Sequence, residues 1–221
     1  MQAPFLIFDL DGTLIDSRSD LATAVNLVRR HYGLPGLPEN VIGGFVGDGI
    51  RALVLRSLEG ANADLDEAVK MQQRFYAEHM ADRTVLYPGV EAGLNLLVAA
   101  GCRLAVASNK LASLSEAILR HFGVRDLFCR VAGDGNTARL KPDPAMITET
   151  MAFAGAGRGD TWVIGDGHTD LESARRAGVR SVFVTYGIGT RGKETPTLTC
   201  ASFGELPAIF APGGMAARTP A

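Results

Sequence analysis

Two carboxylates, Asp9 and Asp11, follow directly on an apolar run near the start of the chain. Residues 5–8 are four apolar residues in a row, which is typical of a strand buried on both faces of a parallel sheet. A buried carboxylate is costly unless a charge or hydrogen bonds compensate it. The pair therefore indicates a site where a cation or a substrate meets the end of a strand.

Other polar side chains occupy equivalent places along the chain. They follow the predicted strands 102–107 and 161–165, or precede the predicted start of a helix at Pro142: Ser108, Asn109, Asp166, Asp170 and Lys141. Ligands of open parallel α/β sheets bind outside the carboxyl ends of the strands. We therefore expect these groups to converge with Asp9 and Asp11 at one edge of the sheet.

Clustered carboxylates without cysteine or histidine ligands suit a hard cation. Mg²⁺ is typically bound by one or two carboxylates together with waters and phosphate oxygens. Such an ion would hold Asp9 and Asp166 ionised, and Lys141 would add a second positive charge. With the Ser108 hydroxyl, these groups suit the charged oxygens of a phosphoryl group during transfer. The cluster predicts a magnesium site with phosphoryl chemistry.

The elements that must position these residues alternate along the second part of the chain. Apolar runs predict strands at 102–107, 127–131, 161–165 and 181–185, and helical spacing predicts helices at 88–100, 111–122, 142–153 and 169–177. This alternation predicts an α/β fold, a doubly wound parallel sheet with a Rossmann-like core and helices on both faces.

Residues 16–85 interrupt this alternation with helical stripes and no strand signal. Leu21, Val25 and Val28 mark one such stripe, and Asp64 with Glu67 three residues later is typical of a helix start. We expect an all-helical cap domain at 16–85, inserted into an α/β core made of 1–15 and 86–221. The connections should act as hinges near 14–19 and 81–86. The small residues of 211–221 predict a frayed tail.

Four segments in order, DLDGTLIDS, VASNK, KPDP and GDGHTD, resemble the signature motifs of the haloacid dehalogenase superfamily. The resemblance extends from residue 5 to about 190, and the helical insert resembles the α-helical cap of that superfamily. It implies that Asp9 is a nucleophile that forms an aspartyl-phosphate. Asp11 would be the general acid and then the base, oriented by Thr13. Dehalogenases of the superfamily lack an acid at this second position, so Asp11 implies a phosphatase.

The resemblance also implies how phosphate and metal are bound. Ser108 and the Asn109 backbone would bind phosphoryl oxygens, and Lys141 would stabilise the charge on Asp9 and on the phosphoryl group. The implied ligands of Mg²⁺ are Asp9, the Asp11 carbonyl and Asp166, with Asp170 behind them. Gly167 stands where the fourth motif usually has serine, but because both acids remain, we expect metal binding to persist.

The predicted cap suggests which ester is hydrolysed. Residues 45–58, FVGDGIRALVLRSL, resemble the VGxGxxxL stretch in the cap of phosphoglycolate phosphatases. Gly47, Asp48 and Gly49 open a helix whose free N–H groups attract anions, and Arg51 follows. We expect these four residues to bind substrate, with 2-phosphoglycolate as the first choice. A broad sugar-phosphate phosphatase or a pyrophosphatase is the alternative, and Asp48 as a plain N-cap with Arg51 in solvent is the alternative interpretation of the segment.

Composition restricts the class of protein. The chain has 221 residues, 47% of them hydrophobic, and a formal net charge of −2 with both signs mixed along its length. We expect a soluble monomer or homodimer that binds a small phosphate ester and no nucleic acid. The absence of a signal peptide, of a long apolar run and of paired cysteines predicts a cytoplasmic protein without a membrane span. The non-enzyme alternative is a phospho-accepting or catalytically silent Mg²⁺-binding α/β domain, disfavoured by Asp11 and by the insert.

Overall fold

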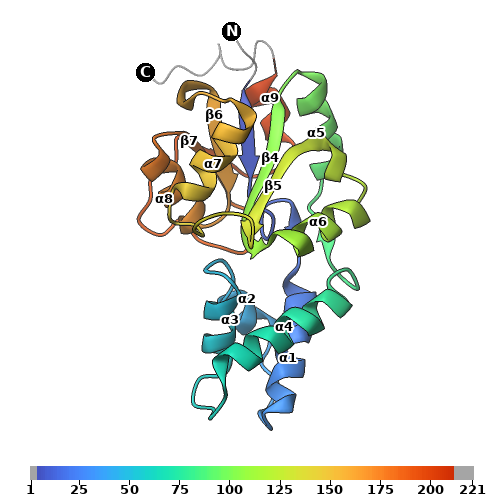
Figure 1. Ribbon diagram of the computed structural model, residues 1–221. Helices are drawn as coiled ribbons and strands as arrows, with labels where there is room; N and C mark the ends of the chain where they lie inside the picture. Colours follow the sequence, from blue (N-terminus) through green and yellow to red (C-terminus); the bar gives the residue numbers. More distant parts are fainter. Residues whose placement is uncertain (1–3, 212–221) are drawn as a thin grey trace.

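A six-stranded parallel sheet forms the centre of the protein in the computed structural model, which describes residues 4–211 (Figure 1). The strand order is β5-β4-β1-β6-β7-β8, and every neighbouring pair is parallel. The strands are β1 Phe5–Phe8, β4 Arg103–Leu111, β5 Phe128–Asp134, β6 Thr161–Gly165, β7 Arg180–Val184 and β8 Leu198–Cys200. Short 3₁₀ turns, Arg125–Leu127 and Arg158–Asp160, lead into β5 and β6. The predicted doubly wound α/β fold is confirmed.

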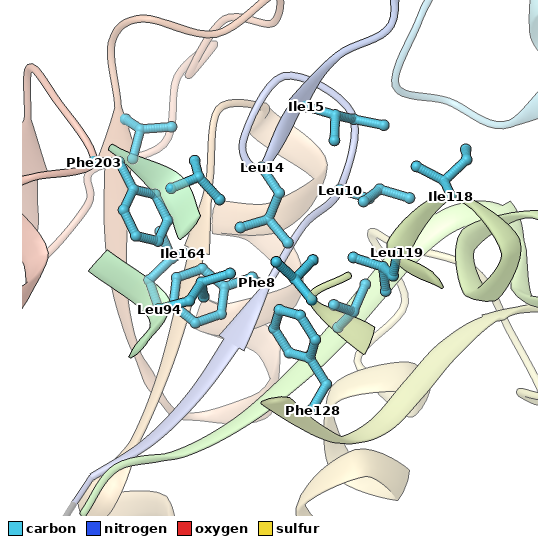
Figure 2. Close-up of a cluster of buried hydrophobic side chains, with 14 of the residues drawn as sticks. Phe8, Leu10, Leu14, Ile15, Leu94, Ile118, Leu119, Phe128, Ile164 and Phe203 are labelled. Carbon is cyan, nitrogen blue, oxygen red and sulfur yellow. The ribbon is translucent and has the colours of Figure 1, made fainter. Parts of the chain in front are cut away.

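Helices cover both faces of the sheet and bury two apolar layers. On one face, Leu6 and Phe8 of β1 pack with α5 (Val90–Ala99), α6 (Ala112–His121) and α9 (Glu205–Phe210). Figure 2 shows Phe8 in this layer, where its ring stacks on that of Phe203 at 5.8 Å between centroids. On the other face, Phe5 and Ile7 pack with α7 (Ala145–Ala154) and α8 (His168–Ala177). Because successive strand residues point to opposite faces, this double burial explains the uninterrupted apolar run of β1.

Four helices follow β2 (Ile15–Asp16) and precede β3 (Val85–Leu86) in the chain, and they lie beyond one end of the sheet (Figure 1). They are α1 Arg18–His31, α2 Glu39–Gly43, α3 Ile50–Ser57 and α4 Leu65–His79. We call residues 17–84 the helical insert; the structure describes no strand within it. Across residues 4–211, no helix has the length and apolar character needed to cross a membrane.

The two connections of the helical insert run side by side. β2 and β3 pair antiparallel, with Ile15 opposite Leu86. Asp20 in α1 is fully buried and accepts hydrogen bonds from the backbone N–H groups of Arg83 and Thr84, and from the Thr84 hydroxyl at 2.7 Å. Since each buried oxygen of Asp20 is satisfied, the entry and the exit of the insert are tied together without a cost in unpaired polar groups.

Several elements differ from the sequence predictions. β4 continues to Leu111, four residues past its predicted end, because Leu111 still pairs with Asp134 of β5. α7 begins at Ala145 and not at Pro142, so Lys141 lies in a turn before the helix. The short elements α2, β8 and α9 were not predicted, since runs of three to six residues carry little periodicity. Of the predicted tail, 212–221 lies outside the described residues.

Candidate active site

A cavity of about 300 Å³ lies between the carboxyl ends of the strands and the helical insert. Most of the predicted site residues line it, from the sheet side Asp9, Asp11, Ser108, Asn109, Asp166 and Asp170, and from the insert side Gly47, Asp48 and Gly49. Lys141 does not line the cavity itself but contacts two of its carboxylates. Parallel strands end at a common edge, which is why residues more than 150 positions apart in sequence meet here.

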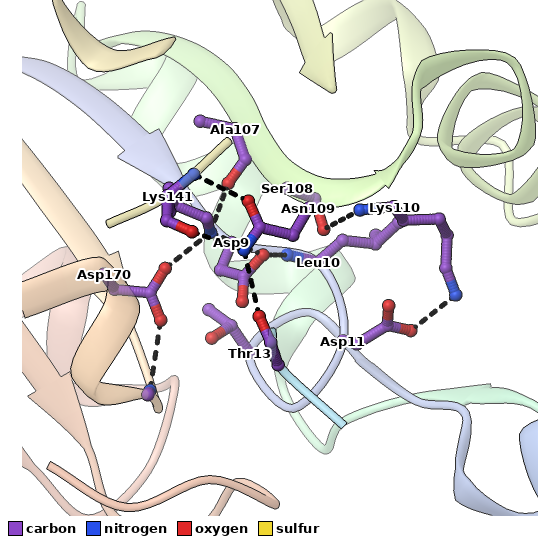
Figure 3. Close-up of polar contacts among 12 residues, drawn as sticks. Asp9, Leu10, Asp11, Thr13, Ala107, Ser108, Asn109, Lys110, Lys141 and Asp170 are labelled. Carbon is purple, nitrogen blue, oxygen red and sulfur yellow. Dashed lines mark hydrogen bonds and ion pairs between the residues drawn. The ribbon is translucent and has the colours of Figure 1, made fainter. Parts of the chain in front are cut away.

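Lys141 holds the carboxylates of Asp9 and Asp170 together. Its side chain is buried, and Nζ lies 3.0 Å from Asp9 Oδ1 and 2.5 Å from Asp170 Oδ1 (Figure 3). Nζ also donates to the carbonyl of Ala107 at 2.6 Å. Burial disfavours the charged amine, but Asp170 and Asp9 outweigh it and raise the pKa of Lys141 above its ordinary value. The lysine is therefore a permanent cation beside Asp9.

Three buried carboxylates repel one another in the same place. One oxygen from each of Asp9, Asp166 and Asp170 lies within 4.8 Å of the others. Burial, with the charge of Asp170, raises the pKa of Asp9 to about 6 against the opposing effect of Lys141. Burial and the charge of Asp9 likewise raise the pKa of Asp166 to about 6. Oxygen-only donors that resist ionisation on their own fit a hard divalent cation, which would relieve the repulsion.

Hydrogen bonds hold Asp166 and Asp170 in place within this cluster. Asp166 Oδ2 accepts the N–H groups of Ile188 and Gly189, both at 2.7 Å. Asp170 uses one oxygen for Lys141 and the other for the N–H of Gly167 at 3.0 Å. Both oxygens of Asp170 are thus occupied by the protein, which fits a place behind the direct ligands of a cation. The Gly167 N–H supports Asp170 without needing a side chain at position 167.

A glycine lets the loop after β1 approach Asp166. Gly12 has a φ of +83°, and a Cβ at this position would lie 2.0 Å from Asp166 Oδ2. The loop also carries Thr13, whose hydroxyl donates to Asp166 Oδ1 at 3.3 Å. Thr13 was predicted to orient Asp11, and this is not what the structure shows. The turn at Gly12 directs Thr13 toward Asp166, while Asp11 accepts a hydrogen bond from Ser17 Oγ at 2.5 Å.

Asp11 is also paired with a lysine that the sequence analysis did not single out. Lys110 Nζ lies 2.8 Å from Asp11 Oδ1 and donates to the hydroxyl of Tyr76 at 2.8 Å. Figure 3 shows Asp11 directed toward Lys110 and away from Lys141. Burial disfavours its charge, but Asp11 and Tyr76 raise the pKa of Lys110 above its ordinary value. Lys110 ends the VASNK motif, but its spacing did not indicate which carboxylate it would meet.

Ser108 and Asn109 lie on the last part of β4, at the floor of the cavity. Both are buried, and the Ser108 hydroxyl oxygen accepts the N–H of Lys110 at 3.4 Å. Asn109 Nδ2 donates to the carbonyls of Lys141 at 2.9 Å and Gly47 at 3.0 Å, and Oδ1 accepts the N–H of Lys141 at 2.8 Å. The Asn109 side chain thus positions the segment that carries Lys141 and contacts the helical insert.

On the insert side, the structure brings a different arginine to the cavity than the sequence predicted. Arg51 does not line it; its side chain is 63% exposed and pairs with Asp66 at 2.5 Å. Arg56 does line it and pairs with Asp48 Oδ2 at 2.5 Å. Five residues along a helix at 100° per residue place the two arginines on different faces of α3. Asp48 is not an N-cap either, since α3 starts from Gly49 without a side-chain cap.

Two further residues at the cavity were not assigned from the sequence. His168 begins α8, and its Nε2 lies 3.7 Å from Asp48 Oδ1. Gln72, on α4, lines the cavity and is buried. His168 lies within the GDGHTD segment but was given no role there, and Gln72 lies outside the four motifs, so the structure is needed to place both at the cavity.

Comparisons with known proteins agree with this arrangement. The family model of haloacid dehalogenase-like hydrolases matches residues 6–184. A phosphoglycolate phosphatase from Chromobacterium violaceum is 37% identical over 205 residues, covering 90% of this chain and 92% of that protein. A phosphoglycolate phosphatase from Neisseria meningitidis is 34% identical and covers 92% of this chain and 90% of its own length.

A solved structure extends the similarity to three dimensions. The crystal structure of a predicted phosphoglycolate phosphatase from Haemophilus somnus 129PT superposes with a TM-score of 0.89 at 28% identity, covering 95% of this chain and 98% of that one. The predicted enzyme class, a phosphatase, is confirmed by these relatives. The strand-end carboxylates, the four ordered motifs and the matched family model together show that the chain belongs to the haloacid dehalogenase-like hydrolases.

Proposed function

We propose that the protein hydrolyses 2-phosphoglycolate with Mg²⁺ through an aspartyl-phosphate on Asp9. The observation that carries this proposal is the position of Asp9, which lines the cavity at the end of β1 with Lys141 3.0 Å away and Asp166 beside it. The substrate is supported by the relatives named phosphoglycolate phosphatase at 34–37% identity. Mg²⁺ is supported by the all-oxygen donor set.

Different residues of the site would bind the metal and the phosphoryl group. Asp9 and Asp166, with the carbonyl of Asp11, would hold Mg²⁺, which when bound supplies charge neutralisation and orients the phosphoryl group. Lys141 opposes the rise in the pKa of Asp9 and offers charge to the phosphoryl oxygens. The buried hydroxyl of Ser108 is at the floor of the same cavity and can donate to one of those oxygens.

Two proton transfers at Asp11 complete the reaction. A carboxylate oxygen of Asp9 attacks phosphorus, the bond between phosphorus and the ester oxygen breaks, and protonated Asp11 gives its proton to the departing alkoxide. Water then attacks phosphorus, Asp11 takes its proton, and the bond between phosphorus and Asp9 breaks. Ser17 and Lys110 hold Asp11 in the lining of the cavity, and the proposed proton transfers require its side chain to turn toward the leaving oxygen.

We also propose that the helical insert acts as a separate cap domain that closes over the leaving group. The predicted hinges near 14–19 and 81–86 include the paired strands β2 and β3. Contacts between the sheet edge and the insert include those of Asn109 with Gly47, Lys110 with Tyr76 and His168 with Asp48. A site that excludes water during transfer and admits it afterwards needs an open and a closed state. Crystals with and without a phosphate analogue should differ by a rotation about β2 and β3; identical insert positions in several ligand states would contradict the proposal.

The direct test is turnover by the purified protein against a panel of phosphate esters. We expect the highest kcat/KM on 2-phosphoglycolate, loss of activity in EDTA and recovery with added Mg²⁺. Asp9→Asn should abolish turnover and covalent phosphate labelling. A higher kcat/KM on sugar phosphates or pyrophosphate would contradict 2-phosphoglycolate as the substrate and favour those esters. No turnover of any ester would favour a binding domain.

A further inference from the structure

Gln72 lines the cavity and has a buried amide without a hydrogen-bond partner among the described residues. The residue lies on α4 of the helical insert and is 1% exposed. Neither its Oε1 nor its Nε2 has a hydrogen-bond partner among the described residues. The other buried unpartnered side-chain atoms belong to Tyr32, Tyr87, Arg130 and Trp162, and none of these residues lines the cavity. A buried amide without a partner costs stability, so a group that is normally bound there would explain why glutamine occupies the position.

The other polar side chains on this side of the cavity already have partners. Arg56 is paired with Asp48, and Tyr76 is bonded to Lys110. Lys110 in turn is paired with Asp11. Among these polar side chains of the insert, the amide of Gln72 is the group without a partner in the described residues.

Gln72 lines the cavity from the insert side, and Asp9 and Asp11 line the same cavity from the sheet side. It precedes Tyr76 by four residues on α4, so both side chains lie on one face of the helix, about one 5.4 Å turn apart. Tyr76 contacts Lys110, and Lys110 contacts Asp11, which also lines the cavity. The lining of the same cavity also includes the apolar side chains of Leu21, Leu53 and Leu114.

We propose that Gln72 is a specificity-determining residue that binds the carboxylate of the leaving group. The inference rests on the proposed function, in which that group is glycolate. The Nε2 group donates to a carboxylate oxygen, and a hydrogen bond to a charged acceptor is stronger than one between neutral groups. Gln72 would then distinguish a carboxylated ester from one of the same length without a carboxylate, whereas the sheet edge binds only the phosphoryl group that all esters share.

The replacement Gln72→Leu separates binding from folding. Leucine is similar in size and removes both unpartnered polar atoms, so a protein in which Gln72 served only the fold would become no less stable. We expect an unchanged or higher melting temperature together with a loss of selectivity. Gln73→Leu is the matched control, because Gln73 is the next residue of the same helix and does not line the cavity.

The assay compares 2-phosphoglycolate with monoethyl phosphate, which carries a methyl group where glycolate has its carboxylate. In Gln72→Leu, kcat/KM for phosphoglycolate should fall about 10- to 150-fold while that for ethyl phosphate changes less than about threefold. Gln72→Glu, which keeps the shape but repels a carboxylate, should show the same selective loss. Gln73→Leu should match the wild type on both esters.

The outcomes distinguish this inference from the proposed function. Equal losses on both esters, or a wild-type preference for phosphoglycolate that survives both Gln72 variants, would overturn the role of Gln72 and leave the substrate intact. A wild-type enzyme with equal kcat/KM on ethyl phosphate and on phosphoglycolate would overturn the proposed substrate, and with it the carboxylate as the ligand of Gln72.

Discussion

Asp166 makes the stability of the metal-free protein depend on pH in a direction opposite to that of an ordinary surface carboxylate. Burial and the charge of Asp9 raise its folded-state pKa from 3.8 to about 6. Because the folded pKa is higher, the folded state binds the proton more tightly than the unfolded state. The contribution of Asp166 is therefore fully present below about pH 4 and is lost as pH rises to about 6. A pKa difference of this size lowers the free energy of unfolding above pH 6 by about 3 kcal/mol relative to its value below pH 4.

Asp166→Asn removes this titration while keeping a carbonyl oxygen for the N–H groups of Ile188 and Gly189. In urea unfolding with EDTA, we expect the wild type to lose about 3 kcal/mol relative to the variant between pH 4 and pH 7. Comparison with the variant cancels the other titrating groups that the two proteins share.

Added Mg²⁺ should reverse the loss. At a concentration of 100 times its dissociation constant, a ligand of the folded state stabilises it by about 2.7 kcal/mol. We expect this gain in the wild type at pH 7.5 and not in Asp166→Asn. A difference between the two proteins that stays constant from pH 4 to pH 7, or an equal gain from Mg²⁺ in both, would refute the reasoning.

Three further substitutions test individual contacts. Lys110→Met leaves Asp11 without its ammonium partner, so the free energy of unfolding should fall by about 1–3 kcal/mol and kcat at least about tenfold. Lys110→Arg should restore part of both losses. A wild-type rate in the methionine variant would contradict the role of Lys110 in positioning Asp11. Asp11→Asn should lower kcat by about 10²–10⁴ but retain an initial burst of phenol from an aryl phosphate, since this leaving group needs no acid; stopped-flow absorbance would show an equal loss of burst and turnover if Asp11 acted only on binding. Arg51→Ala breaks only an exposed pair with Asp66, so kcat/KM on phosphoglycolate should stay within about twofold and stability within about 0.5 kcal/mol; a selective loss on phosphoglycolate would return Arg51 to the site.

Alanine at Gly47 or Gly49 would be a poor test of recognition. Their φ angles are +118° and +88°, which L side chains rarely adopt. The carbonyl of Gly47 also accepts a hydrogen bond from Asn109. A loss of activity in such variants would report the strained turn or the contact with the sheet edge as readily as the binding of an anion.

Local pattern was enough to predict the core and its chemistry. The run of apolar residues at 5–8 could be interpreted as a doubly buried strand because every one of its side chains faces a helical layer. The carboxylates after β1 and β6 could be placed together because parallel strands end at one edge. The helical character of 17–84 could be predicted because its stripes repeat with a period of 3.6 residues. These features follow from local periodicity and from the direction of the strands, and both can be predicted without knowing the tertiary contacts.

The contacts at the cavity wall depended on the tertiary structure. Thr13 and Asp11 are two residues apart, yet across the turn at Gly12 Thr13 donates to Asp166 while Asp11 accepts from Ser17. Arg51 and Arg56 lie on the same helix, α3, but on different faces of it, and only Arg56 lines the cavity. Gln72 belongs to no motif, and only the tertiary structure shows that its amide is buried at the cavity without a partner among the described residues. The sequence by itself determined which elements form and which acids meet, since these follow from local periodicity and strand direction. The tertiary structure decided which side chain faces which, since this depends on how the helical insert packs across the sheet edge.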